Sequence, residues 1–152
     1  EDPTEAAEHA RLIEERNVFM LKNCQERAER YPTMLEIRFE LGEWLFRAGD
    51  VNEAIHAFQR AQNSPGHRLR SLSYLGQCFL QRGMHDMAVS MFEKGLLEKS
   101  AMDDQKKEMV YHLGCVYEGI GKAAEAMEQF KSIYEVDIGY RDVATKVESG
   151  YM

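Results

Sequence analysis

One five-residue pattern occurs three times in this sequence of 152 residues, and this internal repeat constrains the fold more than any other feature. Each copy has a Leu, followed by Gly at +1, Gly at +8, Ala at +13 and Phe at +17. The copies begin at Leu41, Leu75 and Leu113. They are 34 and 38 residues apart, which predicts a four-residue insertion around residues 100–106. A period of this length is typical of repeat proteins, in which each unit buries its apolar faces against its neighbours.

The residue types in the pattern indicate two helices joined by a tight turn. The glycine at +8 is expected to end the first helix with a positive φ angle. The small residues at +1 and +13 allow close approach of the two helices, and the Phe at +17 is predicted to fill the space between one unit and the next. In the first copy, Asp50 followed by Glu53 indicates a capped helix start. Helices are predicted at 35–48, 51–63, 68–82, 85–98, 104–119 and 122–136.

This spacing resembles that of the tetratricopeptide repeat, whose unit is a 34-residue helix–turn–helix. The resemblance implies an all-α fold, a right-handed superhelical α-solenoid, with repeats at 35–66, 69–100 and 103–137. Arg38 departs from the pattern, because a large apolar residue is usual at that repeat position and the other copies have Leu72 and Val110. The run from Glu135 to Ala144 is similar to the segment after the last repeat in a group of bacterial proteins of this family.

Flanking segments are expected to cap the repeats within a single domain, 1–152. The start Asp2-Pro3-Thr4-Glu5 predicts a helix from about 3 to 30, inside a degenerate repeat at 1–32. Since Glu15 replaces the turn glycine, one long helix is expected rather than two. The bulky Trp44 needs a partner on that helix, and Phe19, Met20 and Cys24 are the candidates. Gly139 predicts the end of the last repeat, followed by a capping segment 139–152 with a helix near 140–149.

Composition excludes several classes of function. With 19 basic and 26 acidic residues the net charge is −7, which argues against binding to nucleic acid or to an anionic membrane surface. No apolar run approaches the roughly 18–20 residues that cross a bilayer. Three well-separated cysteines indicate no disulfide framework or zinc finger and favour a reducing compartment such as the cytoplasm. The first residue is not Met, so a processed product or a piece of a longer chain is expected.

No catalytic, metal-binding or cofactor-binding motif is recognisable, so a non-enzymatic role is expected. The five histidines are scattered without ligand spacing. Cys78 falls at a packing position, and Cys115 falls on the predicted inner face without a His–Asp partner in the sequence.

The resemblance also implies a concave groove lined by the first helix of each repeat, which would hold a peptide or another protein. The predicted groove residues are Glu36, Phe39, Glu43, Phe46, Arg47, Arg70, Ser73, Gln77, Leu80, Tyr111, Cys115 and Glu118. Among them, the exposed apolar anchors are expected to be Phe39, Phe46, Leu80 and Tyr111. Alternatively, the N-terminal helix or an oligomer neighbour covers Phe39 and Phe46, and the chain self-associates through these residues or its end helices.

Some members of the family bind acidic C-termini of chaperones through basic and Asn side chains at five repeat positions. In this chain those positions hold Phe39, Glu43, Tyr74, Glu108 and His112. None is Lys, Arg or Asn, and two are acidic. The sequence therefore predicts a partner that is apolar or basic rather than an acidic C-terminus.

Overall fold

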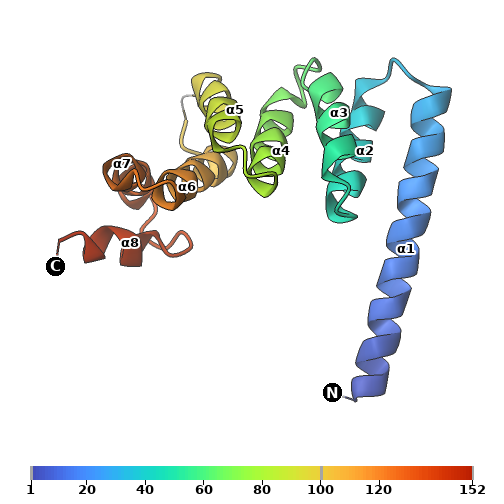
Figure 1. The fold of residues 1–152 in the computed structure, drawn as a ribbon, viewed down its shortest axis with the longest axis horizontal. Helices are drawn as coiled ribbons and strands as arrows, with labels where there is room; N and C mark the ends of the chain where they lie inside the picture. The colour runs from blue at the N-terminus through green and yellow to red at the C-terminus, as the bar shows by residue number, and fades with distance from the viewer. Residues whose placement is uncertain (1, 100, 152) are drawn as a thin grey trace. The chain divides into compact units, whose positions relative to one another are not determined.

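A computed structural model describes residues 2–99 and 101–151, and this part of the chain forms eight helices without a β-strand (Figure 1). The helices are α1 Pro3–Arg30, α2 Leu35–Arg47, α3 Val51–Ala61, α4 Arg68–Gln81, α5 His85–Leu97, α6 Asp104–Gly119, α7 Ala123–Tyr134 and α8 Val143–Ser149. The fold is thus an all-α solenoid of helix–turn–helix repeats, as predicted. The six repeat helices agree with their predicted bounds to within two residues, and α8 begins three residues later than expected.

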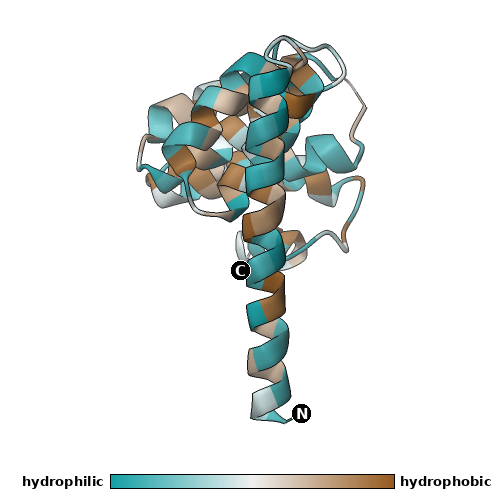
Figure 2. Ribbon diagram, turned by 90° about the vertical axis from the view of Figure 1, so that its right-hand side faces the viewer, coloured by the Kyte–Doolittle hydropathy of each residue, from teal (hydrophilic) through white to brown (hydrophobic). Residues whose placement is uncertain are grey.

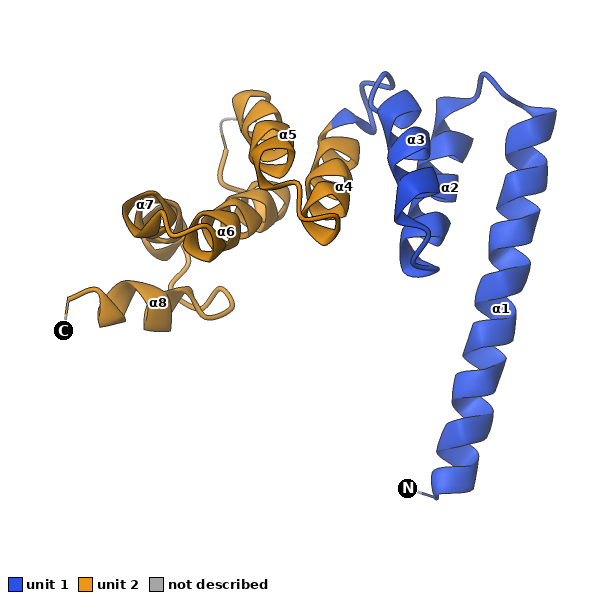
Figure 3. Cartoon of the chain, in the orientation of Figure 1, with its two compact units in different colours: residues 1–68 blue, residues 69–152 orange. Residues whose placement is uncertain are grey.

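The chain divides into two compact units (Figure 3). Unit 1 is Glu1–Arg68 and contains α1, α2 and α3; unit 2 is Leu69–Met152 and contains nearly all of α4 together with the helices that follow it. Each unit has its own buried apolar side chains, including Phe58 in unit 1 and Phe92 in unit 2.

The turn glycines have the backbone conformation that the sequence predicted. Gly49, Gly83 and Gly121 have φ angles of 81°, 72° and 81°. L-residues rarely adopt this region, so glycine at these positions ends each first helix without strain. The second helix of the first repeat begins at its predicted cap, where the Asp50 carboxylate accepts a hydrogen bond from the Glu53 N–H at 3.4 Å.

Each repeat Phe lies against the Gly of its own helix pair. A Cβ atom added to Gly76 would lie 2.5 Å from the Phe92 ring. A Cβ atom added to Gly42 would lie 2.7 Å from the Phe58 ring, and one added to Gly114 would lie 2.7 Å from the Phe130 ring. The sequence had placed these rings between successive units, and only part of that is correct: Phe92 does stack on His112 of the next repeat, with ring centroids 5.8 Å apart.

Helix α1 is one continuous helix, as the absence of a turn glycine predicted. The Asp2 carboxylate caps it by accepting a hydrogen bond from the Thr4 N–H at 2.9 Å. Its C-terminal half packs on α2 and buries Cys24 and Ala28, whereas every residue from 2 to 16 is exposed. Of the three candidate partners for Trp44, Phe19 has 66% of its surface exposed, whereas Cys24 is fully buried.

The C-terminal segment closes the core of unit 2. Val143 and Val147 of α8 are buried in one cluster with Val110, Ala126, Phe130 and Ile133 of α6 and α7. After α7 the chain turns at Gly139, whose N–H donates to the Asp137 carboxylate at 3.2 Å. This segment therefore covers apolar surface that the last repeat would otherwise expose.

Candidate functional site

The first-helix face of unit 1 is formed by α2, and it differs from the sequence prediction at Phe39. Glu36 and Arg47 are exposed, and Glu43 and Phe46 are half-buried. Phe39, predicted to be an exposed anchor, is only 4% exposed. Phe39 is therefore a core residue of this unit and is not available as a ligand anchor.

Two aromatic rings of its own unit pack against Phe39. Its ring centroid is 5.7 Å from that of Phe58 in an edge-on arrangement and 4.8 Å from that of His67. The His67 Nδ1 lies 3.3 Å from the Ser64 hydroxyl.

The corresponding face of α4 in unit 2 is polar with one apolar residue. Arg70 is exposed, and Ser73, Gln77 and Leu80 are half-buried. The Gln77 amide lies 3.4 Å from both the Ser73 carbonyl and the Ser73 hydroxyl. Leu80 thus keeps partial access to solvent at the C-terminal end of this face.

Helix α6 carries Tyr111, Cys115 and Glu118, and the C-terminal segment engages the first of these. The Tyr111 hydroxyl donates a hydrogen bond to the Asp142 carboxylate at 2.6 Å. The Arg141 guanidinium lies 4.8 Å above the Tyr111 ring, and the Tyr140 ring packs edge-on at 6.0 Å. Burial and then the Asp142 hydrogen bond raise the pKa of Tyr111. Tyr111, predicted to be an exposed anchor, is therefore half-buried and held by its own chain.

Glu118 is tied to the same segment. The Lys146 ammonium donates to the Glu118 carboxylate at 2.8 Å and lies 5.1 Å from the Phe130 ring centroid. The bond to Glu118 raises the pKa of Lys146. A pocket of about 400 Å³ lies beside this ion pair; its lining includes Ala126, Thr145 and Gly150.

On α6, the Glu108 Oε1 atom lies 3.8 Å from the His112 Nε2 atom. This interaction with His112 lowers the pKa of the Glu108 carboxyl, although partial burial opposes the shift. Glu108 therefore adds a negative charge at one of the five positions that other family members use for acidic C-termini.

Sequence reasoning missed the residues that cover α6. Arg141, Asp142 and Lys146 lie outside the repeat pattern, so no spacing rule pointed to them. Arg141 has a φ of 42°, unusual for a residue other than Gly, Asn or Asp. Two sequence features marked this segment: the turn signal at Gly139, and the similarity of the run from Glu135 to Ala144 to the segment after the last repeat in a group of bacterial proteins.

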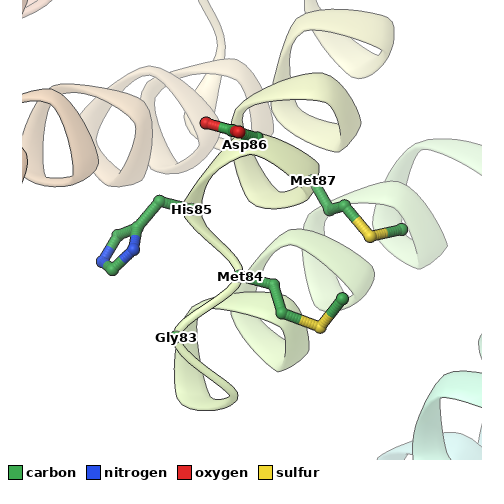
Figure 4. Close-up of a pocket in the computed structure, with 5 residues that line it drawn as sticks. All are labelled: Gly83, Met84, His85, Asp86 and Met87. Carbon is green, nitrogen blue, oxygen red and sulfur yellow. The ribbon is translucent and has the colours of Figure 1, made fainter.

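A second pocket, of about 340 Å³, lies at the turn between α4 and α5 (Figure 4). It is lined by the consecutive residues 83–87, in which Met84 and Met87 extend to the same side and His85 points away from them. Consecutive residues on one exposed turn do not converge on a ligand, so the pocket contributes no binding chemistry.

The three cysteines occupy different environments. Cys24 and Cys78 are fully buried, and burial raises the pKa of each thiol to about 11. Cys115 is half-buried, and burial raises the pKa of its thiol too. Thiolates are the reactive form, so none of the three is activated as a nucleophile.

Within residues 2–99 and 101–151, no group of three or more His, Cys, Asp or Glu side chains is arranged to hold a metal ion. None of the helices described combines the length and apolar character of a membrane-spanning segment.

Two family models, each described as tetratricopeptide repeat, match residues 36–67 and 108–137 of this chain. These segments contain α2 with α3 and most of α6 with α7, the first and third copies of the sequence pattern. Among curated proteins, no sequence matches this chain.

Solved structures with the same fold are similar at low sequence identity. MamA has a TM-score of 0.77 and 15% identity over 94% of this chain and 76% of its own. SycD, the type III secretion chaperone of Yersinia enterocolitica in complex with a peptide of the translocator YopD, has a TM-score of 0.64 and 20% identity over 76% of this chain and 90% of its own. The second such domain of human RPAP3, in complex with the HSP70 peptide SGPTIEEVD, has a TM-score of 0.62 and 16% identity over 76% and 92%.

Proposed function

Because this chain is a tetratricopeptide repeat protein, we propose that it is a non-enzymatic interaction module that binds a peptide segment of another protein along its first-helix faces. Repeat proteins of this kind present extended surfaces to their partners rather than enclosed catalytic sites. Two proteins with the same fold, SycD and RPAP3, were solved with bound peptides, which supports this class of function.

The observation that carries the proposal is the mixture of accessible apolar and polar side chains on these faces. In unit 1, the half-buried Phe46 shares α2 with the half-buried Glu43 and the exposed Arg47. In unit 2, the half-buried Leu80 shares α4 with the half-buried Gln77. An apolar side chain with partial access and a polar surround is the usual composition of a binding hot spot. Of the four anchors predicted from the sequence, Phe46 and Leu80 are kept in this proposal, whereas the buried Phe39 and the Asp142-bound Tyr111 are not.

We further propose that the partner is apolar or basic rather than an acidic C-terminus. Two of the five positions that other family members use for acidic C-termini hold Glu43 and Glu108 in this chain. The pKa of Glu108 is lowered, so its carboxylate remains charged at neutral pH. Like charges facing each other at an interface select against the wrong ligand. The acidic peptide bound by RPAP3 is therefore a useful negative probe here.

Peptide binding tests the proposal directly. Fluorescence anisotropy would compare an apolar–basic peptide library with the acidic peptide SGPTIEEVD. We expect Phe46→Ala combined with Leu80→Ala to weaken library binding about tenfold or more, as loss of a hot spot does, with unchanged helicity. The matched control is Leu97→Ala, which removes an 88% exposed apolar side chain on α5. Tight binding of the acidic peptide, or hits unaffected by the double variant, would contradict the assignment.

A further inference from the structure

The N-terminal half of α1 is a helix without a neighbour inside unit 1. All residues from 2 to 16 are exposed, and the helix extends past α2 (Figure 1). An isolated helix of about 12–15 residues is only marginally stable in water. A second helix packed along this half would therefore stabilise it.

Two large apolar side chains lie on the side of α1 that faces away from α2. Leu12 is 51% exposed and Phe19 is 66% exposed. They are seven residues apart, about two turns, so they share one face of the helix. The residues buried against α2, Cys24 and Ala28, lie about 120–180° around the helix from them at 3.6 residues per turn. In Figure 2, brown bands of hydrophobic residues interrupt the largely teal, hydrophilic ribbon of α1.

The charges of α1 are divided between its two halves. Residues 2–15 contain five acidic side chains and Arg11, a net charge of 1 − 5 = −4. Residues 16–30 contain four basic and two acidic side chains, a net charge of 4 − 2 = +2. Arg27 is paired with Glu40 of α2 at 2.9 Å, which still leaves this half at +1. An antiparallel second α1 would place each acidic half beside a basic half, whereas a parallel pair would place like charges together.

We propose that two copies of this chain associate by antiparallel pairing of their α1 helices about a two-fold axis between residues 15 and 16. This axis matches residue i of one copy with residue 31 − i of the other. Leu12 then faces Phe19 of the second copy, and Glu15 faces Arg16. A two-fold interface repeats each contact, so the apolar pair and the charged pair each occur twice. Because the pairing uses the side away from α2, it leaves the packing inside unit 1 intact and does not depend on peptide binding.

The first experiment measures association by sedimentation equilibrium over a wide range of protein concentration. We expect a reversible dimer that weakens with added salt, since the paired charges are exposed. Phe19→Glu should lower the association constant by at least about tenfold, as loss of an aromatic anchor does. Leu97→Glu, the same change at a more exposed apolar residue, should leave it unchanged. A strict monomer at every concentration, or a dimer insensitive to Phe19→Glu, would overturn the proposal.

Charge reversal tests the orientation. Glu15→Arg alone and Arg16→Glu alone should each weaken the dimer, because each places like charges across the axis. The two changes together restore an opposite pair and should recover most of the wild-type association. Failure of this rescue, with helicity maintained, would contradict the antiparallel pairing.

Cross-linking gives a second test of orientation, in a Cys115→Ser background. A mixture of Leu12→Cys and Phe19→Cys chains should form a disulfide-linked heterodimer on oxidation, and each variant alone should not. Efficient self-cross-linking of the Leu12→Cys chain would instead show parallel helices and overturn the proposal.

Discussion

At Gly76 the packing of two helices depends on a missing side chain. A Cβ at this position would lie 2.5 Å from the Phe92 ring, a distance that real Cβ atoms do not show. We expect Gly76→Ala to destabilise the protein by roughly 1–3 kcal/mol, because the aromatic ring is itself buried and has little room to move. Urea denaturation would measure this change. Gly119→Ala is the matched control, since nothing lies within 4 Å of its added Cβ. Equal stability of the two variants would contradict this account.

The cysteines should differ in their reactivity toward alkylating reagents. Cys24 and Cys78 are fully buried and have thiol pKa values near 11, so they lack both access and thiolate. We expect iodoacetamide at neutral pH to modify Cys115 alone in the folded protein, slowly, and all three after denaturation. Mass spectrometry of the labelled peptides would show the order. Early labelling of Cys24 would mean that α1 separates readily from α2.

Glu108 is expected to make stability depend on acidic pH. Its pKa is lowered in the folded state by His112, so its contribution is fully present above the unfolded value of about 4.3 and is lost as pH falls through the lower folded value. Glu108→Gln should therefore reduce the loss of stability between neutral and acidic pH. Denaturation midpoints at a series of pH values would test this, with Glu128→Gln on α7 as the exposed control. Parallel pH profiles for wild type and Glu108→Gln would argue against the assignment.

Among the elements, α8 connects the C-terminal segment to the repeat core. Val147 is buried beside Val143 in the cluster formed with α6 and α7. We expect Val147→Asp to destabilise unit 2 by about 3 kcal/mol, because it buries a carboxylate without a partner. Thr145→Asp on the same helix is exposed and should have little effect. Calorimetry would compare the two, and a normal transition for Val147→Asp would show that α8 is dispensable.

Local signals explain why the helices were predictable. Turn glycines, the Asp2 and Asp50 caps and the small residues at close contacts act within one repeat, so their spacing determines the bounds of each element. Phe39 and Tyr111 were misjudged because the groups that cover them lie elsewhere. His67 comes from the loop before α4, and Asp142 from the segment after α7; neither belongs to the repeat pattern. Contacts of this kind depend on tertiary placement, which periodicity does not encode.

On the scale of the whole molecule, each compact unit has its own core. A substitution that destabilises one unit should therefore affect that unit more than the other. Repeat stacks are stabilised mainly by interactions within and between neighbouring repeats. Gly42→Ala would place a Cβ 2.7 Å from Phe58 in unit 1. We expect it to reduce hydrogen-exchange protection in α2 and α3 more than in α6 and α7. Uniform loss of protection across both units would indicate a single cooperative transition instead.

The glycine–phenylalanine contacts have a consequence for how such a sequence can change over time. In each repeat the space that a glycine leaves is filled by the aromatic ring 16 residues later, as with Gly42 and Phe58. A residue larger than glycine is tolerated only once the phenylalanine has been replaced by a smaller residue. Neither of these two substitutions is favourable alone. Among proteins that descend from this chain, the residues at the glycine and phenylalanine positions should therefore change together in each of the three repeats. Residues on the surrounding surface should change independently of them.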